Sequence, residues 1–333
     1  MAGAPVPETK IDATPAHKDR SIGLVVFGVL EILIGVCCAA LIPLSLVAQA
    51  LGNAGSVVPG DARSVLPAMV VYAALATAFV WLGVGSIRAR RWARELSVSL
   101  SWVWLLTGIC SMILAWLLLP FLLRELAGEG GFPREVAVLV TVVTTVVLLF
   151  VYVLLPGALL LFFRSPHVAA TCRVRDPGRQ WTDDLPQRLL TLAIVWALAA
   201  VSVLVMPAYR FVVPFFGVVL TGLAGAAVWV VILIGCVALA WGSARREPWA
   251  WRGAMIAVLL GAFSTVLTFL RVDLSEMVRA MDLPDDQAAL ITDAMMPDRW
   301  VVILFWIVAW GSFLAYLMTL RRFFAARPAE ADD

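Results

Sequence analysis

Long apolar runs constrain the fold of this chain more than any other feature. Runs of about 20 apolar residues, the length a helix needs to cross the hydrocarbon core of a bilayer, recur along the 333-residue chain. The chain is 62% hydrophobic and 14% charged, whereas soluble domains are nearer half apolar and a quarter charged. Outer-membrane strands would alternate polar and apolar residues, and these runs do not. The sequence therefore predicts an all-α, polytopic integral membrane helix bundle.

The apolar runs predict about eight membrane-spanning helices. The first run is too long for the apolar core of a signal peptide, so we expect it to be an uncleaved membrane anchor. The expected spans are 22–48, 67–87, 97–120, 137–163, 189–208, 214–241, 253–271 and 300–320.

The basic residues are unevenly divided between the two sets of connections. The N-terminal tail, the connections 2–3, 4–5 and 6–7, and the C-terminus hold 18 of the 25 Lys and Arg residues. The positive-inside rule then predicts that both termini are cytoplasmic. Only Lys10 and Lys18 are lysines, and this arginine-rich composition is typical of a GC-rich bacterial genome. We therefore expect a bacterial cytoplasmic (inner) membrane.

Two short stretches of the chain resemble each other. Gly85–Ala93 reads GSIRARRWA and Gly242–Ala250 reads GSARREPWA, so Gly, Ser, one Arg, Trp and Ala recur at one offset of 157 residues, from 85 to 242. Each stretch ends one apolar run and opens the next, which predicts an internal repeat. The repeating unit would be four helices. Because four is even, the two copies would be parallel repeats that enter the membrane from the same side.

This interpretation divides the chain into five parts. The acidic loop within the fourth part has apolar residues at helical spacing, which predicts two short amphipathic helices lying over the membrane face. The parts are a disordered cytoplasmic tail (1–20), a first four-helix membrane repeat (21–163), a cytoplasmic connector (164–188), a second four-helix membrane repeat (189–324) with an acidic extracytoplasmic loop (272–299), and a short cytoplasmic tail (325–333).

Glu31 is the candidate buried ionisable residue. It is the only charged residue well inside an expected span, about 13 Å beyond Ile22 at 1.5 Å per residue, which is near the bilayer middle. A charge there costs at least about 2.5 kcal/mol, so we expect a protonated, hydrogen-bonded carboxyl. Gly28 and Gly35 share its helix face, and such small residues mark contacts between helices. Glu31 is thus either a proton, cation or substrate site, or a packed carboxyl bonded to a hydroxyl such as Thr107, Ser111, Thr144 or Thr145.

Basic and aromatic residues gather in the two repeated turns. Arginine attracts anionic lipid headgroups, and tryptophan favours the membrane interface. We interpret these residues as topology signals and lipid-headgroup contacts, and the patches are too short to indicate nucleic-acid binding. They are Arg88, Arg90, Arg91, Trp92 and Arg94 in the first turn, and Arg245, Arg246 and Trp249 in the second.

The connector carries the pattern F-x-S-P-x-V-x-x-T-C-x-x-x-D-P-x-x-x-W-T-D from Phe163 to Asp183. This pattern resembles a segment of uncharacterised bacterial multi-pass membrane proteins, and the resemblance implies no activity. Cys172 is a possible reactive thiol, because neighbouring arginines would lower its pKa. The spacing of His167, Cys172, Asp183 and Asp184 matches no standard zinc motif, so no metal is predicted.

The sequence predicts no catalytic activity and no cofactor. It contains no phosphate loop, dinucleotide fingerprint, H-E-x-x-H or G-x-S-x-G motif. Because the spans hold few polar residues, we expect a non-enzymatic structural, scaffolding or lipid-contact role, with 164–188 or 272–299 as surfaces for a protein partner. The alternative is a small-solute or proton-coupled ion transporter with Glu31 in the pathway. Dense packing at Glu31 would favour the first role, and a polar-lined cavity there the second.

Overall fold

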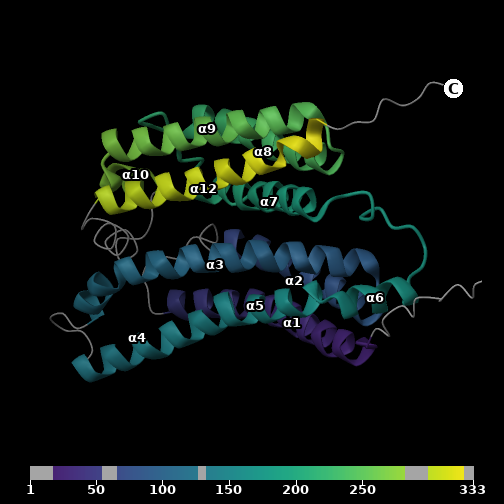
Figure 1. Ribbon diagram of the computed structural model, residues 1–333. Coiled ribbons are helices and arrows are strands. Elements are labelled where there is room, and N and C mark those ends of the chain that lie inside the picture. Colours follow the sequence, from purple (N-terminus) through teal and green to yellow (C-terminus); the bar gives the residue numbers. More distant parts are fainter. Residues whose placement is uncertain (1–17, 55–65, 127–132, 282–298, 326–333) are drawn as a thin grey trace, which may run out of the picture.

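The described chain folds into a bundle of long apolar helices (Figure 1). The computed structural model describes residues 18–54, 66–126, 133–281 and 299–325. Within these ranges, seven helices are long and apolar enough to cross a membrane, which confirms the predicted class of polytopic helix bundle. An eighth apolar helix has only 17 residues, so the number of eight spans stays a prediction.

The first half of the chain is built from two helix pairs. Helix α1 packs on α2, and α3 packs on α5, which continues α4 through one π-helical turn. The elements are α1 (Ser21–Ala54), α2 (Leu66–Ile87), α3 (Arg91–Leu126), α4 (Arg134–Leu149), η2 (Phe150–Leu154), α5 (Leu155–Arg164) and α6 (Pro166–Arg175).

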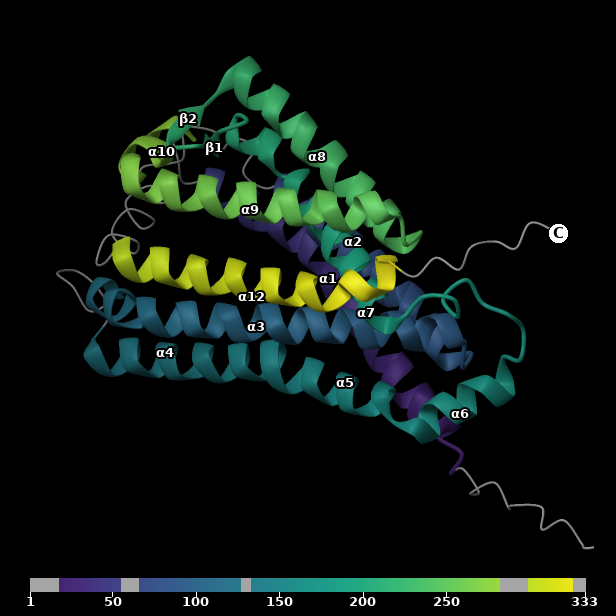
Figure 2. The same cartoon turned by 45° about the horizontal axis from the view of Figure 1, so that its top comes forward.

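The second half pairs its helices in the same order. Helix α7 packs on α8, and α9 packs on α12, and Figures 1 and 2 both show these helices as a group beside the first half. The elements are α7 (Gln187–Val203), η3 (Met206–Tyr209), β1 (Val213–Phe215), β2 (Val218–Leu220), α8 (Gly222–Ala244), α9 (Pro248–Arg271), α10 (Leu274–Ala280) and α12 (Arg299–Ala325).

Each half has its own apolar core. In the first half, the start of α1 packs through Leu24 against Phe163 of α5 and Val168 of α6. In the second half, Trp196 of α7, Val258 of α9 and residues of α12 form a separate cluster. The start of α1, helix α6 and the end of α12 lie at one end of the bundle, which we name the connector end (Figure 1).

The two repeated turns have the same backbone geometry. Ala89 and Arg246 both adopt a left-handed conformation, with φ of 52° and 56°. The N–H of the next residue donates across the turn to Gly85 and to Gly242, in each case over 2.9 Å, which is the Schellman arrangement that ends a helix. Each glycine is needed because a Cβ would lie within 2.8 Å of the following Trp and Ala side chains. The sequence similarity therefore corresponds to a shared local structure.

One expected element is wrong. We expected a helix from residue 214, but 213–220 form an antiparallel hairpin of β1 and β2. Its turn residues Phe216 and Gly217 are left-handed, with φ of 48° and 81°, and their N–H groups donate to hydroxyls of α9, Ser264 at 3.0 Å and Thr268 at 3.3 Å. These hydroxyls satisfy backbone groups that a helix would have bonded internally.

The acidic loop and the tails are only partly described. Helix α10 (Leu274–Ala280) is one short helix of the predicted kind, and Asp273 caps it by accepting from the N–H of Ser275. Residues 282–298, and with them the rest of the acidic loop, lie outside the described residues, as do tail residues 1–17 and 326–333.

Candidate functional site

Glu31 is buried between three helices. Its side chain is 2% exposed, which confirms that it faces protein. Its Oε2 accepts from the Ser86 hydroxyl of α2 and its Oε1 from the Ser97 hydroxyl of α3, both over 2.7 Å. Both carboxyl oxygens therefore have a partner, and the group is held as part of the packing between α1, α2 and α3.

The expected kind of partner, a hydroxyl of a neighbouring helix, is confirmed, but the four residues named for it are wrong. Thr107, Ser111 and Thr144 are exposed, and Thr145 donates to the Thr141 carbonyl. Helix α1 extends past the end of α2 to meet α6, so Glu31 lies beside Ser86 in the last turn of α2. The G-S pair of the repeated turn, whose serine Ser86 bonds Glu31, was the one sequence signal that could have indicated this partner.

The second half has the serine but not the carboxyl. Ser243 corresponds to Ser86 and is fully buried, yet its hydroxyl has no hydrogen-bond partner in the part of the chain that the structure describes. Thus the two halves share the turn and differ in the polar group that it holds.

The first basic turn is tied to the connector through Asp176. The side chain of Asp176 is 5% exposed. It accepts from the guanidinium of Arg90 at 3.1 Å and from the backbone N–H of Arg91 at 3.2 Å. Arg91 is the first residue of α3, so Asp176 places a negative charge at the positive end of that helix dipole.

Further contacts continue this attachment. Arg91 pairs with Asp183, and Arg94 pairs with Glu95 and donates its Nε to the Phe163 carbonyl at 2.9 Å. From α7, Gln187 donates to the Glu95 carbonyl at 2.9 Å. The connector is therefore fixed against the start of α3, and α7 is fixed there too.

These contacts give protein partners to arginines that we had assigned to lipid headgroups. Arg88 of the first turn is exposed. In the second turn Arg246 is exposed, Trp249 is 44% exposed, and Arg245 lies 4.4 Å from the Trp241 ring centroid. Contact with headgroups stays a prediction for both turns, and the second turn has more side-chain surface for it.

The connector pattern consists mainly of buried residues. Ser165 and Pro166 start α6, and the Thr171 hydroxyl accepts from the Arg20 N–H at 3.1 Å and donates to the His167 carbonyl. The pattern residues that are less than 5% exposed are Phe163, Val168, Thr171, Cys172, Asp176 and Thr182. The pattern therefore folds α6 and the following loop onto α1 and α3.

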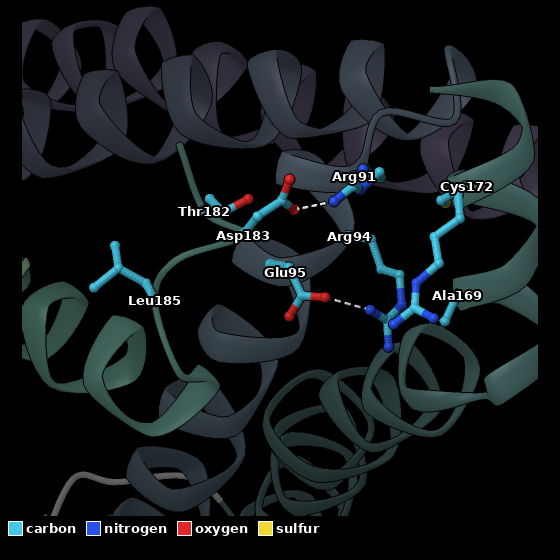
Figure 3. A pocket seen from close by; sticks show the side chains of 9 residues that line it. Arg91, Arg94, Glu95, Ala169, Cys172, Thr182, Asp183 and Leu185 are labelled. Carbon is cyan, nitrogen blue, oxygen red and sulfur yellow. Dashed lines mark hydrogen bonds and ion pairs between the residues drawn. The ribbon is translucent and has the colours of Figure 1, made fainter. Parts of the chain in front are cut away.

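A polar cavity of about 220 Å³ lies between these elements (Figure 3). One wall is the first turn of α3, a second is a face of α6, and a third is the loop before α7. Figure 3 shows Arg91 directed at Asp183 and Arg94 directed at Glu95. The lining residues are Arg91, Arg94, Glu95, Ala169, Cys172, Arg173, Thr182, Asp183 and Leu185.

The interpretation of Cys172 as a reactive thiol was wrong. Its side chain is 1% exposed. Burial raises the pKa of the thiol to about 11, and the nearby Arg94 and Arg175 lower it too little to offset that effect. The thiol is therefore protonated at neutral pH. The neighbouring arginines suggested a low pKa for the thiol. The packing of α6 on α1 buries the thiol, and this burial has the larger effect on its pKa.

Comparisons with known proteins give no relative. No protein-family model, no curated protein and no solved structure matches the chain.

Proposed function

We propose that this chain is a non-enzymatic multi-pass protein of a bacterial cytoplasmic membrane with a structural or scaffolding role and with both termini in the cytoplasm. The observation that carries this proposal is the state of Glu31. Both of its oxygens accept hydrogen bonds from serines, and its side chain is 2% exposed. A carboxyl that carries protons or cations along a pathway must be reached by water, and this one is enclosed by protein.

The proposal includes a duplication of a four-helix unit. Its support is the shared order of helix pairing, the shared turn geometry at Ala89 and Arg246, and the burial of Phe163 and Phe324 at the ends of the two copies. Two similar membrane units joined by a fixed connector are suited to a scaffold that holds protein partners and lipids in place. Protein partners would dock on 164–188 or 272–299, and anionic lipid headgroups on the second turn.

Carbodiimide labelling of native membranes tests the proposal. We expect Glu31 to remain unmodified at every pH from acidic to alkaline, because the reagent cannot reach a carboxyl enclosed by Ser86 and Ser97. Mass spectrometry of the α1 peptide measures the modification. The positive control is Leu33→Glu, since Leu33 is 54% exposed on the same helix and a carboxyl there should be modified.

Modification that falls as pH rises through a midpoint would contradict the scaffolding role. It would mean that Glu31 titrates in contact with solvent, as a proton-coupled transporter requires. Transport assays with Glu31→Gln would then replace the search for partners.

A further inference from the structure

The cavity at the connector end carries an unbalanced positive charge. Its lining includes three arginines and two carboxylates. Arg91 and Arg94 are paired with those carboxylates, Asp183 and Glu95. Arg173 of α6 is exposed, and its guanidinium makes no ion pair or hydrogen bond within the described chain. One guanidinium is therefore left to attract an anion.

A buried hydroxyl without a partner lines the same cavity. Thr182 is 1% exposed, and its Oγ1 has no hydrogen-bond partner among the residues described. In Figure 3 this oxygen is turned toward the middle of the lining side chains. Leaving such a group buried without a hydrogen bond is unfavourable, and a bound acceptor would supply the missing bond.

The side chains that line the cavity indicate an anionic rather than a cationic ligand. A cation would need free carboxylates or a thiolate, but both carboxylates are engaged by arginine and the Cys172 thiol is protonated at neutral pH. Guanidinium and hydroxyl groups are donors for the oxygens of a phosphate group. The volume of about 220 Å³ holds such a group, since a water molecule takes about 30 Å³.

We propose that this cavity binds a phosphate group, with Arg173 and Thr182 as donors and with Arg91 and Arg94 supplying further positive charge. The phosphate is that of a lipid headgroup or of a free phosphate anion, because the cavity lies where apolar helices end and the connector begins. Its binding can be tested separately from the scaffolding role, because the cavity does not include Glu31.

Thermal unfolding of the full-length protein in dodecyl maltoside tests the site. One arm titrates inorganic phosphate, and the other adds phosphatidic acid with phosphatidylcholine as its reference. We expect a saturable rise of the unfolding midpoint in at least one arm. A rise with phosphatidic acid alone identifies a lipid headgroup, and a rise with inorganic phosphate identifies the free anion.

Two variants and one matched control locate the binding. Arg173→Gln and Thr182→Val should each weaken the apparent affinity by about tenfold, the effect of losing a hydrogen bond to a charged group. Arg164→Gln is the control, because Arg164 is also exposed at the connector end and does not line the cavity. It should bind as the unchanged protein does.

Two results would overturn the site. One is the absence of a saturable shift in both arms. The other is an Arg173→Gln variant that binds as tightly as Arg164→Gln. Arg173 has no internal partner in the described chain, so Arg173→Gln should fold normally, and its unfolding midpoint without phosphate checks this.

Discussion

At the scale of single residues, the two repeated serines provide a matched test of what a buried hydroxyl does. Ser86 donates to Glu31, and Ser243 has no partner in the described chain. We expect Ser86→Ala to lower the free energy of unfolding by about 1–3 kcal/mol, because it leaves a carboxyl oxygen of Glu31 buried and unpaired. Ser243→Ala should be neutral or stabilising, because it removes a hydroxyl that is buried without a bond.

Thermal or denaturant unfolding in detergent measures both serine variants. The two positions share the same turn geometry. If replacing a serine in this turn were destabilising in itself, both variants would lose the same free energy of unfolding. Equal losses of stability would therefore contradict the special role of the Glu31 contact.

At this scale, the sequence predicted the burial of Glu31 better than it predicted the hydrogen-bond partners of that residue. Small residues on one face of α1 indicated that Glu31 faces protein, and it does. Its partners, Ser86 and Ser97, depend on how α1, α2 and α3 are shifted along one another, and no local pattern in the sequence encodes that shift. The burial of Cys172 and the unpaired hydroxyl of Thr182 depend on the same long-range packing and have no local signal.

At the scale of elements, one buried carboxylate joins the connector to the start of α3. Asp176 accepts from Arg90, from the N–H of Arg91 and from Gln180. We expect Asp176→Ala to increase the amide hydrogen exchange of α6 and the loop that follows it by at least about tenfold, because bonds to a charged acceptor contribute about 1.5–3 kcal/mol each.

A neighbouring carboxylate is the control for this prediction. Asp184 pairs with Arg179 at 2.9 Å, but their side chains are 64% and 80% exposed, and such surface pairs contribute little. Asp184→Ala should leave the exchange rates nearly unchanged. If both variants exchange alike, Asp176 is not what fixes the connector.

The sequence predicted the apolar helices but not the β1–β2 hairpin. Hydropathy identified the apolar helices, because the bilayer requires length and apolarity and little else. It could not identify the β1–β2 hairpin, since residues 213–220 are as apolar as the helix that follows. What separates them is the left-handed turn at Phe216 and Gly217 and the two α9 hydroxyls that bond it, and those contacts are distant in sequence.

At the scale of the whole molecule, two separately packed halves meet along α3 and α7. The polar contacts of this seam lie near the connector, where Gln187 and Thr191 donate to Ser99. The connector, its cavity and the seam therefore form one polar layer at one end of an otherwise apolar molecule, which is the arrangement expected where a bundle leaves the membrane.

That arrangement predicts the outcome of topology reporters. The start of α1, helix α6 and the end of α12 share one end of the bundle, so reporters after Gly178 and after Asp333 should agree with each other and indicate the cytoplasm. Alkaline phosphatase, which is active only outside the cytoplasm, should be inactive at both positions and active after Ala289 in the acidic loop; a fluorescent protein that folds only in the cytoplasm should give the opposite pattern. If the reporters after Gly178 and Asp333 indicated different sides of the membrane, the second half could not have an even number of crossings. If alkaline phosphatase were active at both positions, the orientation would be the reverse of the one that the arginines predict.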